Sequence, residues 1–126
     1  MKTPDTVLVL EIHIKVVGKN LLNSWNLLDS AVNRPFQTFD EKELYPDLFE
    51  KAAVLLESIV KNHPFIDGNK RTGYVSVIEF LEEHDFSLIT NIDDIIDLLE
   101  GIAMSKYKIS DTIKFFEHNC IKTLYG

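Results

Sequence analysis

A nine-residue segment from His63 to Arg71, with the sequence HPFIDGNKR, carries the side chains best suited to chemistry in this chain. His63 is a candidate general base for a hydroxyl group, because an imidazole titrates close to neutral pH. Asp67 offers hard oxygen ligands of the kind that a magnesium ion accompanying polyphosphate prefers. Gly68 lies in a predicted tight turn, and the free backbone N–H groups beside Lys70 and Arg71 would form an anion site suited to phosphate.

The positions of Lys70 and Arg71 favour a binding site over a plain connector. Both cations fall in the first turn of a predicted helix, where the helix dipole disfavours each by about 0.3–1 kcal/mol. Each neighbour taken alone also fits a connector, since Pro64 ends a helix, the Asp-Gly pair turns the chain and Asn69 is a good N-cap. The combination is what predicts a phosphate site with an imidazole at its rim.

Helical periodicity dominates the rest of the chain, so we predict an all-α protein of about six helices. Helices are expected from Val7 to Val17 (ended by Gly18), from Asn26 to Asn33, from Leu48 to the break at Pro64, from about Asn69, from Thr90 with capping-box spacing to Asp93, and from Ser110. The residues expected to be buried are, helix by helix, Val7, Leu10, Ile14 and Val17; Leu27, Leu28 and Ala31; Leu48, Ala52, Leu55, Leu56 and Ile59; Tyr74, Val77, Ile78 and Leu81; Ile92, Ile95, Ile96 and Leu99; and Ile113, Phe116 and Cys120. On the third helix, Glu50, Lys51, Glu57 and Lys61 are expected to face solvent.

The segment from Arg34 to Asp40, RPFQTFD, breaks the helical pattern. Phe36 and Phe39 stand among polar residues without helical spacing, so the segment is expected to be extended or hairpin-like. We leave open whether these two aromatic rings pack within a hairpin or contact a target.

Composition narrows the class of protein. The chain has 126 residues, enough for a single domain over residues 1–126, and a net charge of −7, which argues against direct nucleic-acid binding. One cysteine, Cys120, cannot form an internal disulfide. No apolar run approaches the roughly 20 residues that span a membrane, and the start lacks a signal-peptide pattern. We therefore expect a cytoplasmic protein with no membrane partner.

HPFIDGNKR resembles the signature of the Fic/Doc (Fido) superfamily, and its lysine form resembles the death-on-curing (Doc) branch. The similarity extends to LLDSA at residues 27–31, to Arg34-Pro35 and to LYPDLFEKAA at residues 44–53, so that it covers roughly residues 10–116. The resemblance implies a single helical Fido-type bundle with a short hairpin called the flap. One departure is the single glycine, Gly18, where Doc-like chains often have a glycine pair.

The resemblance also implies a role for each matching residue. His63 resembles the catalytic base that takes a proton from a target hydroxyl, and Phe65 resembles the buried anchor of the loop. Asp67 resembles the acid that holds Mg²⁺ on the nucleotide phosphates. Phosphate-binding positions are matched by Gly68, Asn69, Lys70 and Arg71. The flap that aligns a target peptide by strand pairing is matched by Phe36, Gln37, Thr38 and Phe39.

Two departures from the adenylylating Fic pattern affect the predicted reaction. Lys70 stands where that pattern has glycine, and Tyr74 stands where it has a second arginine. The resemblance to Doc-like chains, which share the lysine, implies that ATP binds in the reversed sense and gives its γ-phosphate to a protein. Such a transfer needs positioning and charge neutralisation, which Lys70, Arg71 and a metal on Asp67 would supply. The alternative is a Fic-type adenylyltransferase that transfers AMP to a protein hydroxyl.

The absence of a self-inhibitory motif predicts that a separate chain inhibits this protein. Many Fic proteins carry a self-inhibitory helix with Ser or Thr four residues before a Glu-Gly or Glu-Asn pair. Glu100-Gly101 is the one such pair in the sequence, and Ile96 occupies the earlier position. The resemblance therefore implies a cognate antitoxin that fills the active-site groove, and a threonine of translation elongation factor Tu as the target.

Two further readings remain as alternatives, a binding module with a vestigial loop and a helix-turn-helix DNA reader. The second fits poorly, because the helix after the loop carries Glu79, Glu82 and Glu83, which DNA would repel. Several other residues are expected to be structural: His13, His84, His118, Cys120 and Trp25.

Overall fold

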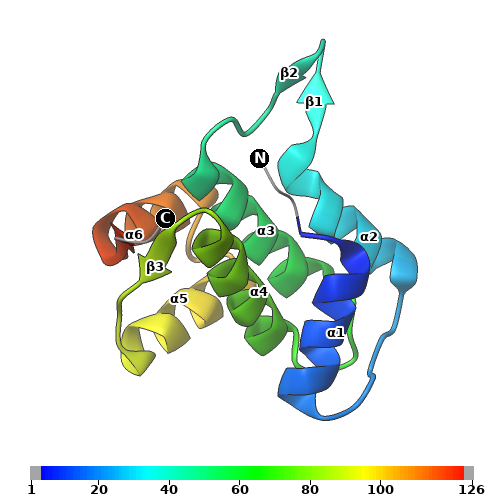
Figure 1. The fold of residues 1–126 in the computed structure, drawn as a ribbon. Helices are drawn as coiled ribbons and strands as arrows, with labels where there is room; N and C mark the ends of the chain where they lie inside the picture. Colours follow the sequence, from blue (N-terminus) through cyan, green and yellow to red (C-terminus); the bar gives the residue numbers. More distant parts are fainter. Residues whose placement is uncertain (1–3, 124–126) are drawn as a thin grey trace.

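The structure is a computed structural model that describes residues 4–123. Within this range the chain forms six α-helices, in agreement with the predicted all-α class (Figure 1). They are α1 (Thr6–Val17), α2 (Trp25–Asn33), α3 (Leu48–Asn62), α4 (Asn69–Glu83), α5 (Ile92–Ala103) and α6 (Ile109–Asn119). No helix of the described residues is long and apolar enough to cross a membrane.

Four short strands accompany the helices. They are β1 (Thr38–Phe39), β2 (Lys42–Glu43), β3 (Phe86–Leu88) and β4 (Cys120–Lys122). β1 and β2 form the predicted hairpin, which extends from the helical body beyond a 3₁₀ turn at Arg34–Phe36 (Figure 1). β3 and β4 pair antiparallel, so Cys120 lies in a strand and the prediction that it continues the sixth helix is wrong. The β3–β4 pairing joins segments far apart in sequence and leaves no local signal.

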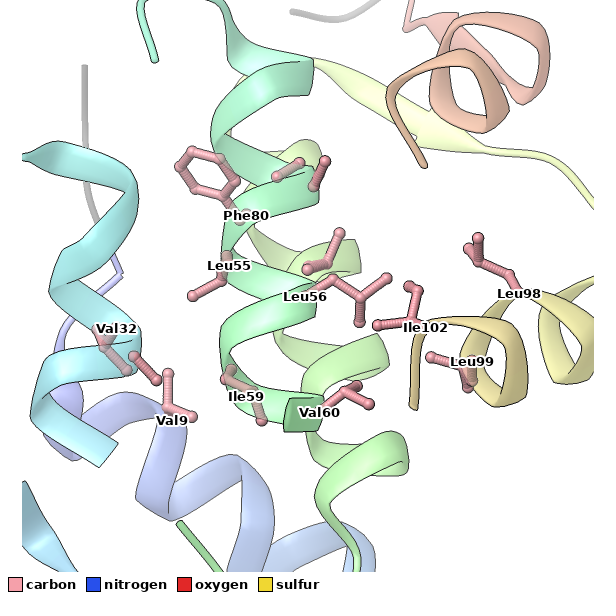
Figure 2. Close-up of a cluster of buried hydrophobic side chains, with 14 of the residues drawn as sticks. Val9, Val32, Leu55, Leu56, Ile59, Val60, Phe80, Leu98, Leu99 and Ile102 are labelled. Carbon is pink, nitrogen blue, oxygen red and sulfur yellow. The ribbon is translucent and has the colours of Figure 1, made fainter. Parts of the chain in front are cut away.

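The core is organised around α3, which contacts α2, α4, α5 and α6. On one side of α3, Leu55 and Ile59 are directed toward α1 and α2, where Val9 and Val32 lie (Figure 2). Its opposite side carries Leu56 and Val60 toward α5, where Leu99 and Ile102 lie (Figure 2). The four α3 side chains are no more than 1% exposed. Burial of apolar side chains on both sides holds α3 in place, at about 1.5–3 kcal/mol per side chain relative to exposure.

Side-chain caps fix where several helices begin. Asp5 caps α1 by accepting hydrogen bonds from the N–H groups of Val7 and Leu8, and Ser24 caps α2. Asn91, not Thr90, caps α5 by accepting from Asp94 N, so the cap lies one residue later than expected. Because capping satisfies N–H groups that have no partner within the helix, these residues set the start points that position the loops.

The buried faces of three helices differ from the prediction. In α1, Val7 is 50% and Ile14 is 39% exposed, while the buried residues are Thr6, Val9, Ile12 and His13. α1 is apolar on most of its circumference, so its packing against α2 and α4 decides which residues are covered. In α5, Ile92 is 73% and Ile96 is 47% exposed, although both were expected in the core. Leu27, expected to be buried in α2, is 40% exposed.

Candidate active site

The loop between α3 and α4 begins with a sharp change of direction at His63. His63 adopts a left-handed conformation with φ 49° and ψ 55°, and Pro64 follows it and prevents helix continuation. The Pro64 carbonyl accepts hydrogen bonds from the N–H groups of Asn23 (2.9 Å) and Ser24 (3.2 Å). The loop is therefore fastened by backbone hydrogen bonds to the segment between α1 and α2.

Phe65 anchors the middle of this loop, at the position where the resemblance implied a buried anchor. Its side chain is 1% exposed and its ring stacks on the ring of His13, with centroids 3.7 Å apart and planes 4° from parallel. Phe65 also forms an antiparallel bridge with Leu22, and Ile66 N donates to the Leu21 carbonyl at 2.9 Å. These contacts bind the loop to α1 and to the chain that follows it.

Asn69 ties the two ends of the loop together. The prediction that Asn69 is the N-cap of α4 is wrong, because Gly68 occupies the cap and Asn69 is the first helical residue. Its side chain instead pairs with the backbone of Phe65: Oδ1 accepts from Phe65 N at 3.0 Å, and Nδ2 donates to Phe65 O at 2.8 Å. This double hydrogen bond closes the loop and fixes the orientation of the Asn69 amide.

Gly68 occupies a position that a larger residue cannot take without strain. Its φ of 82° lies in the left-handed region, and a Cβ there would clash with Val17 Cγ2. The Gly68 N–H donates to Asp67 Oδ1 at 2.8 Å. Because the chain turns into α4 at this point, the next N–H groups point out of the helix end.

Among residues 4–123, no partner is recorded for the first backbone N–H groups of α4. The hydrogen bond from Thr72 N to Gly68 O (2.9 Å) is the first of α4, so the N–H groups of the three preceding residues precede the helical ladder. Those residues are Asn69, Lys70 and Arg71. Free N–H groups at the positive end of a 15-residue helix make an anion site.

A hollow of about 390 Å³ opens at this helix end, and we name it the anion hollow. Its lining consists of Val17, Val60, His63, Ile66, Asp67, Gly68, Asn69, Lys70 and Arg71. The structure thus brings together every predicted catalytic, metal and phosphate residue around one concave surface. The predicted flap residues Phe36 to Phe39 do not line it.

The His63 imidazole stands at the rim of the anion hollow and is exposed. Its Nδ1 lies 3.4 Å from Asn69 Nδ2. Because an amide N–H can only donate, Nδ1 faces Asn69 as an acceptor, and in this contact the neutral ring carries its proton on Nε2. A base that uses Nε2 needs the other tautomer, so the ring must turn out of this long, weak contact before it accepts a proton there.

The two cations of the site are exposed side chains, but one of them is fixed. Arg71 Nη1 donates to the Val16 carbonyl at 3.2 Å, near the end of α1. The hydrogen bond holds the guanidinium at one edge of the anion hollow. Lys70 has no such tether among the described residues, so its ammonium group is free to reach a bound anion.

The surroundings of Asp67 fit a magnesium ion carried by a nucleotide and not a dedicated metal centre. Asp67 Oδ1 accepts the Gly68 N–H, and no hydrogen bond among the described residues involves Oδ2. No cluster of three or more His, Cys, Asp or Glu side chains suited to a metal occurs in residues 4–123. Mg²⁺ often takes one or two carboxylates and completes its shell with phosphate oxygens and water. The Asp67 Oδ2 atom, at the edge of the anion hollow, could supply one such ligand.

The predicted flap is a hairpin with a two-residue turn. Thr38 pairs with Glu43 and Phe39 with Lys42, and the turn residues Asp40 and Glu41 have φ values of 55° and 66°. Positive φ at both central positions is the geometry of a type I′ turn, which suits the twist of a two-stranded hairpin.

The two aromatic rings of this segment lie in different surroundings. Phe36 packs edge-on against Phe80, with ring centroids 6.0 Å apart, while Phe39 is 76% exposed. Phe36 therefore packs against α4 and not within the hairpin, and Phe39 remains available for a target.

Lys51 is a positioning residue that the sequence prediction missed. It was expected to face solvent, yet it is fully buried. Its Nζ donates to the Tyr45 carbonyl, lies 3.0 Å from Glu43 Oε1 and stands 5.9 Å from the Phe36 ring centroid. Lys51 therefore connects α3 to both ends of the flap. Its spacing three residues after Leu48 and four before Leu55, on the apolar face, is a signal of burial.

His13 is a second residue beneath the loop, and its burial agrees with the structural role expected from the sequence. Leu21 N donates to Nε2 at 3.3 Å, so Nδ1 carries the proton and donates to Thr72 Oγ1 at 2.9 Å. Burial lowers the pKa of His13 below its usual value of 6.5, and the nearby carboxylate of Asp67 opposes this shift. The neutral ring links α1, α4 and the stacked Phe65.

Comparison with known proteins agrees with this geometry. The model of the Fic/DOC family matches residues 4–81, which contain the flap, α3, the anion hollow and most of α4. The protein named Toxin Doc of Mycolicibacterium smegmatis is 38% identical to this chain over 88 residues, which are 68% of each chain. The family match covers more than half of the chain and contains every predicted site residue, and so the chain belongs to the Fic/Doc family.

Proposed function

We propose that this chain is a Doc-like toxin of a toxin–antitoxin pair, which transfers the γ-phosphate of ATP to a protein hydroxyl. The similarity to a protein named Toxin Doc supports the toxin role. The anion hollow supports the chemistry, because it combines helix N–H groups, two cations, a free carboxylate oxygen and an exposed imidazole. The observation that carries the proposal is the convergence of His63 and the start of α4 on this one hollow.

In the proposed reaction, the target hydroxyl oxygen attacks the γ-phosphorus while His63 takes the hydroxyl proton. The bond from the γ-phosphorus to the bridging oxygen breaks, and ADP leaves. The N–H groups at the start of α4 and the charges of Lys70 and Arg71 stabilise the negative charge on the transferring group. A magnesium ion, held by Asp67 on the nucleotide, would neutralise further phosphate charge.

The nature of residues 70 and 74 favours γ-phosphate transfer over adenylyl transfer. Lys70 places a long cationic side chain where the adenylylating pattern has glycine, and this side chain occupies space beside the helix end. Tyr74, one turn later, is half-buried and neutral, so the second arginine of that pattern has no counterpart here. Both differences change where the phosphates of ATP are held.

The target and the regulator follow from the family resemblance. We propose a threonine of elongation factor Tu as the acceptor, presented along the exposed flap, so that modification stops translation in the cytoplasm. A cognate antitoxin would fill the active-site groove in trans. Ile96 stands where a self-inhibitory motif would have Ser or Thr, and it is consistent with inhibition by a separate chain.

The proposal is tested with ATP labelled separately at the α and γ positions, purified toxin and elongation factor Tu. We expect label from the γ position alone on the target, and none with the His63→Ala variant. His63 is exposed at the loop rim, so its replacement should leave the fold intact, which circular dichroism checks. Label from the α position would instead assign adenylyl transfer. Unchanged growth arrest by His63→Ala would assign a non-catalytic binding role.

A further inference from the structure

A second hollow, of about 580 Å³, lies between the first turns of α4 and the helix α5. We name it the α4–α5 hollow. Lys70 and Arg71 line both this hollow and the anion hollow, so the two cavities share a boundary made of two cationic side chains. A ligand with an anionic part in one hollow can therefore extend its remaining part into the other.

The walls of the α4–α5 hollow are mainly apolar. Ile92 and Ile96 of α5 line it and are 73% and 47% exposed, although the sequence pattern placed them in the core. Tyr74 of α4 contributes a half-buried aromatic ring. Exposed apolar side chains around a concave surface are typical of small-molecule sites. A flat heteroaromatic ring fits such walls through its faces.

The hollow also has a polar group without a partner. Thr90, which lines it, has a buried hydroxyl with no hydrogen-bond partner among the described residues. Buried hydroxyl groups are normally hydrogen-bonded, so this one marks a place where a ligand is expected to complete the bonding. The neighbouring Asn91 is already engaged, because its side chain caps α5 through Asp94. A ring edge that both donates and accepts would satisfy Thr90.

We propose that the α4–α5 hollow binds the nucleoside of the phosphate donor, with the base between Tyr74 and the isoleucines of α5. This inference rests on the proposed function, because it assumes a nucleotide in the anion hollow. The phosphate chain crosses the boundary formed by Lys70 and Arg71 and ends beside His63. The base then lies on the far side of the two cations from the imidazole, so the terminal phosphate is the one presented to a target hydroxyl.

The test compares ATP with inorganic tripolyphosphate, which has the phosphate chain and no nucleoside. The dissociation constants of both ligands are measured by calorimetry in the presence of Mg²⁺ for the wild-type chain, for Ile96→Trp and for Thr90→Val. Ile96→Trp fills the hollow from an exposed position, and Thr90→Val removes the hydroxyl at nearly constant volume. As a matched control, Ile121→Trp alters an exposed residue of β4 that lines neither hollow.

We expect the wild-type chain to bind ATP at least tenfold more tightly than tripolyphosphate. Ile96→Trp should weaken ATP binding at least tenfold and Thr90→Val about fivefold, while tripolyphosphate binding stays within twofold in both. Equal wild-type affinities for the two ligands, or Ile96→Trp binding ATP normally, would overturn the nucleoside site and leave the anion hollow standing. Binding of neither ligand would overturn the proposed function and this inference together.

Discussion

The ring of His13 lies flat against the ring of Phe65, 3.7 Å away and within 4° of parallel. His13 belongs to α1, and Phe65 belongs to the loop between α3 and α4, fifty-two positions later in the sequence. The same imidazole reaches Thr72 of α4 and the backbone of Leu21. The floor of the candidate active site therefore joins α1, α4 and the loop between α3 and α4. The conformation of this loop depends on its contacts with α1 as much as on its own residues.

The first prediction concerns the pH dependence of stability through His13. Because burial lowers the pKa of His13 in the folded state, the unfolded chain binds a proton below about pH 6.5 that the folded chain does not. Its contribution to the unfolding free energy is therefore full above about pH 7 and falls as the pH drops below 6.5. Urea denaturation at pH 7.5 and 5.5 should show that His13→Gln loses less unfolding free energy between the two pH values than the wild type does. Equal losses would contradict a buried neutral ring.

The second prediction concerns Gly68 and the helix end. Gly68→Ala should cost about 1–2 kcal/mol for the left-handed backbone and more for the clash between the new Cβ and Val17 Cγ2. Gly18→Ala is the matched control, because its φ of 92° brings the same backbone strain with no atom within 4 Å. Thermal denaturation should rank Gly68→Ala as the less stable variant, and Val17→Ala should rescue the difference. If Val17→Ala does not restore the stability of Gly68→Ala, the extra destabilisation does not come from the contact with Val17.

The third prediction separates metal binding by Asp67 from its turn hydrogen bond. Asp67→Asn keeps an oxygen that can accept from Gly68 N and removes the negative charge, so the melting temperature should stay nearly unchanged. Mg²⁺ should strengthen ATP binding to the wild type and have little effect on ATP binding to the variant. Calorimetry with and without a chelator measures both. A variant that unfolds would show that Asp67 is a structural turn residue.

The fourth prediction concerns Lys51 as the support of the flap. Lys51→Met removes the donor to the partly buried Tyr45 carbonyl and the partner of the exposed Glu43, and loss of a hydrogen bond from a charged group costs about 1.5–3 kcal/mol. Hydrogen exchange should quicken in the hairpin, and the KM for the protein target should rise while ATP affinity stays constant. Lys42→Met, at an exposed position of β2, is the control. Unchanged hydrogen exchange in the hairpin would show that Lys51 does not position the flap.

The fifth prediction concerns Lys70 and the reaction type. Lys70→Gly should abolish γ-phosphate transfer, because it removes the charge and the bulk beside the helix end. Lys70→Met retains the bulk, so comparison of the two variants separates charge from space. Full transfer activity of Lys70→Gly would show that this lysine does not set the orientation of the nucleotide.

Local features were predicted well from the sequence. The third helix has a broad apolar stripe and a proline at its end, so its limits need no distant information. The residues of the signature loop adjoin one another in sequence, which is why they also adjoin one another in the anion hollow. The hairpin was indicated by the loss of helical spacing around Phe36 and Phe39.

Features that depend on distant partners were not predicted. Asparagine is a residue type that often caps helices, but the Asn69 side chain pairs with the backbone of Phe65 because the folded loop brings the two together. The β3–β4 pairing and the buried Lys51 likewise require partners that local patterns do not specify. The apolar face of α5 misled the prediction in another way, because Ile92 and Ile96 line an open hollow and not the core.

We propose above all that the start of α4 holds the phosphates of a nucleotide within reach of His63. The most direct measurement is a titration of the purified chain, free of any antitoxin, with Mg-ATP while the backbone amide signals are followed by NMR. We expect saturable binding with the largest signal changes at Gly68, Asn69 and Lys70. No affinity for ATP with or without a divalent cation, or changes confined to another part of the molecule, would contradict it.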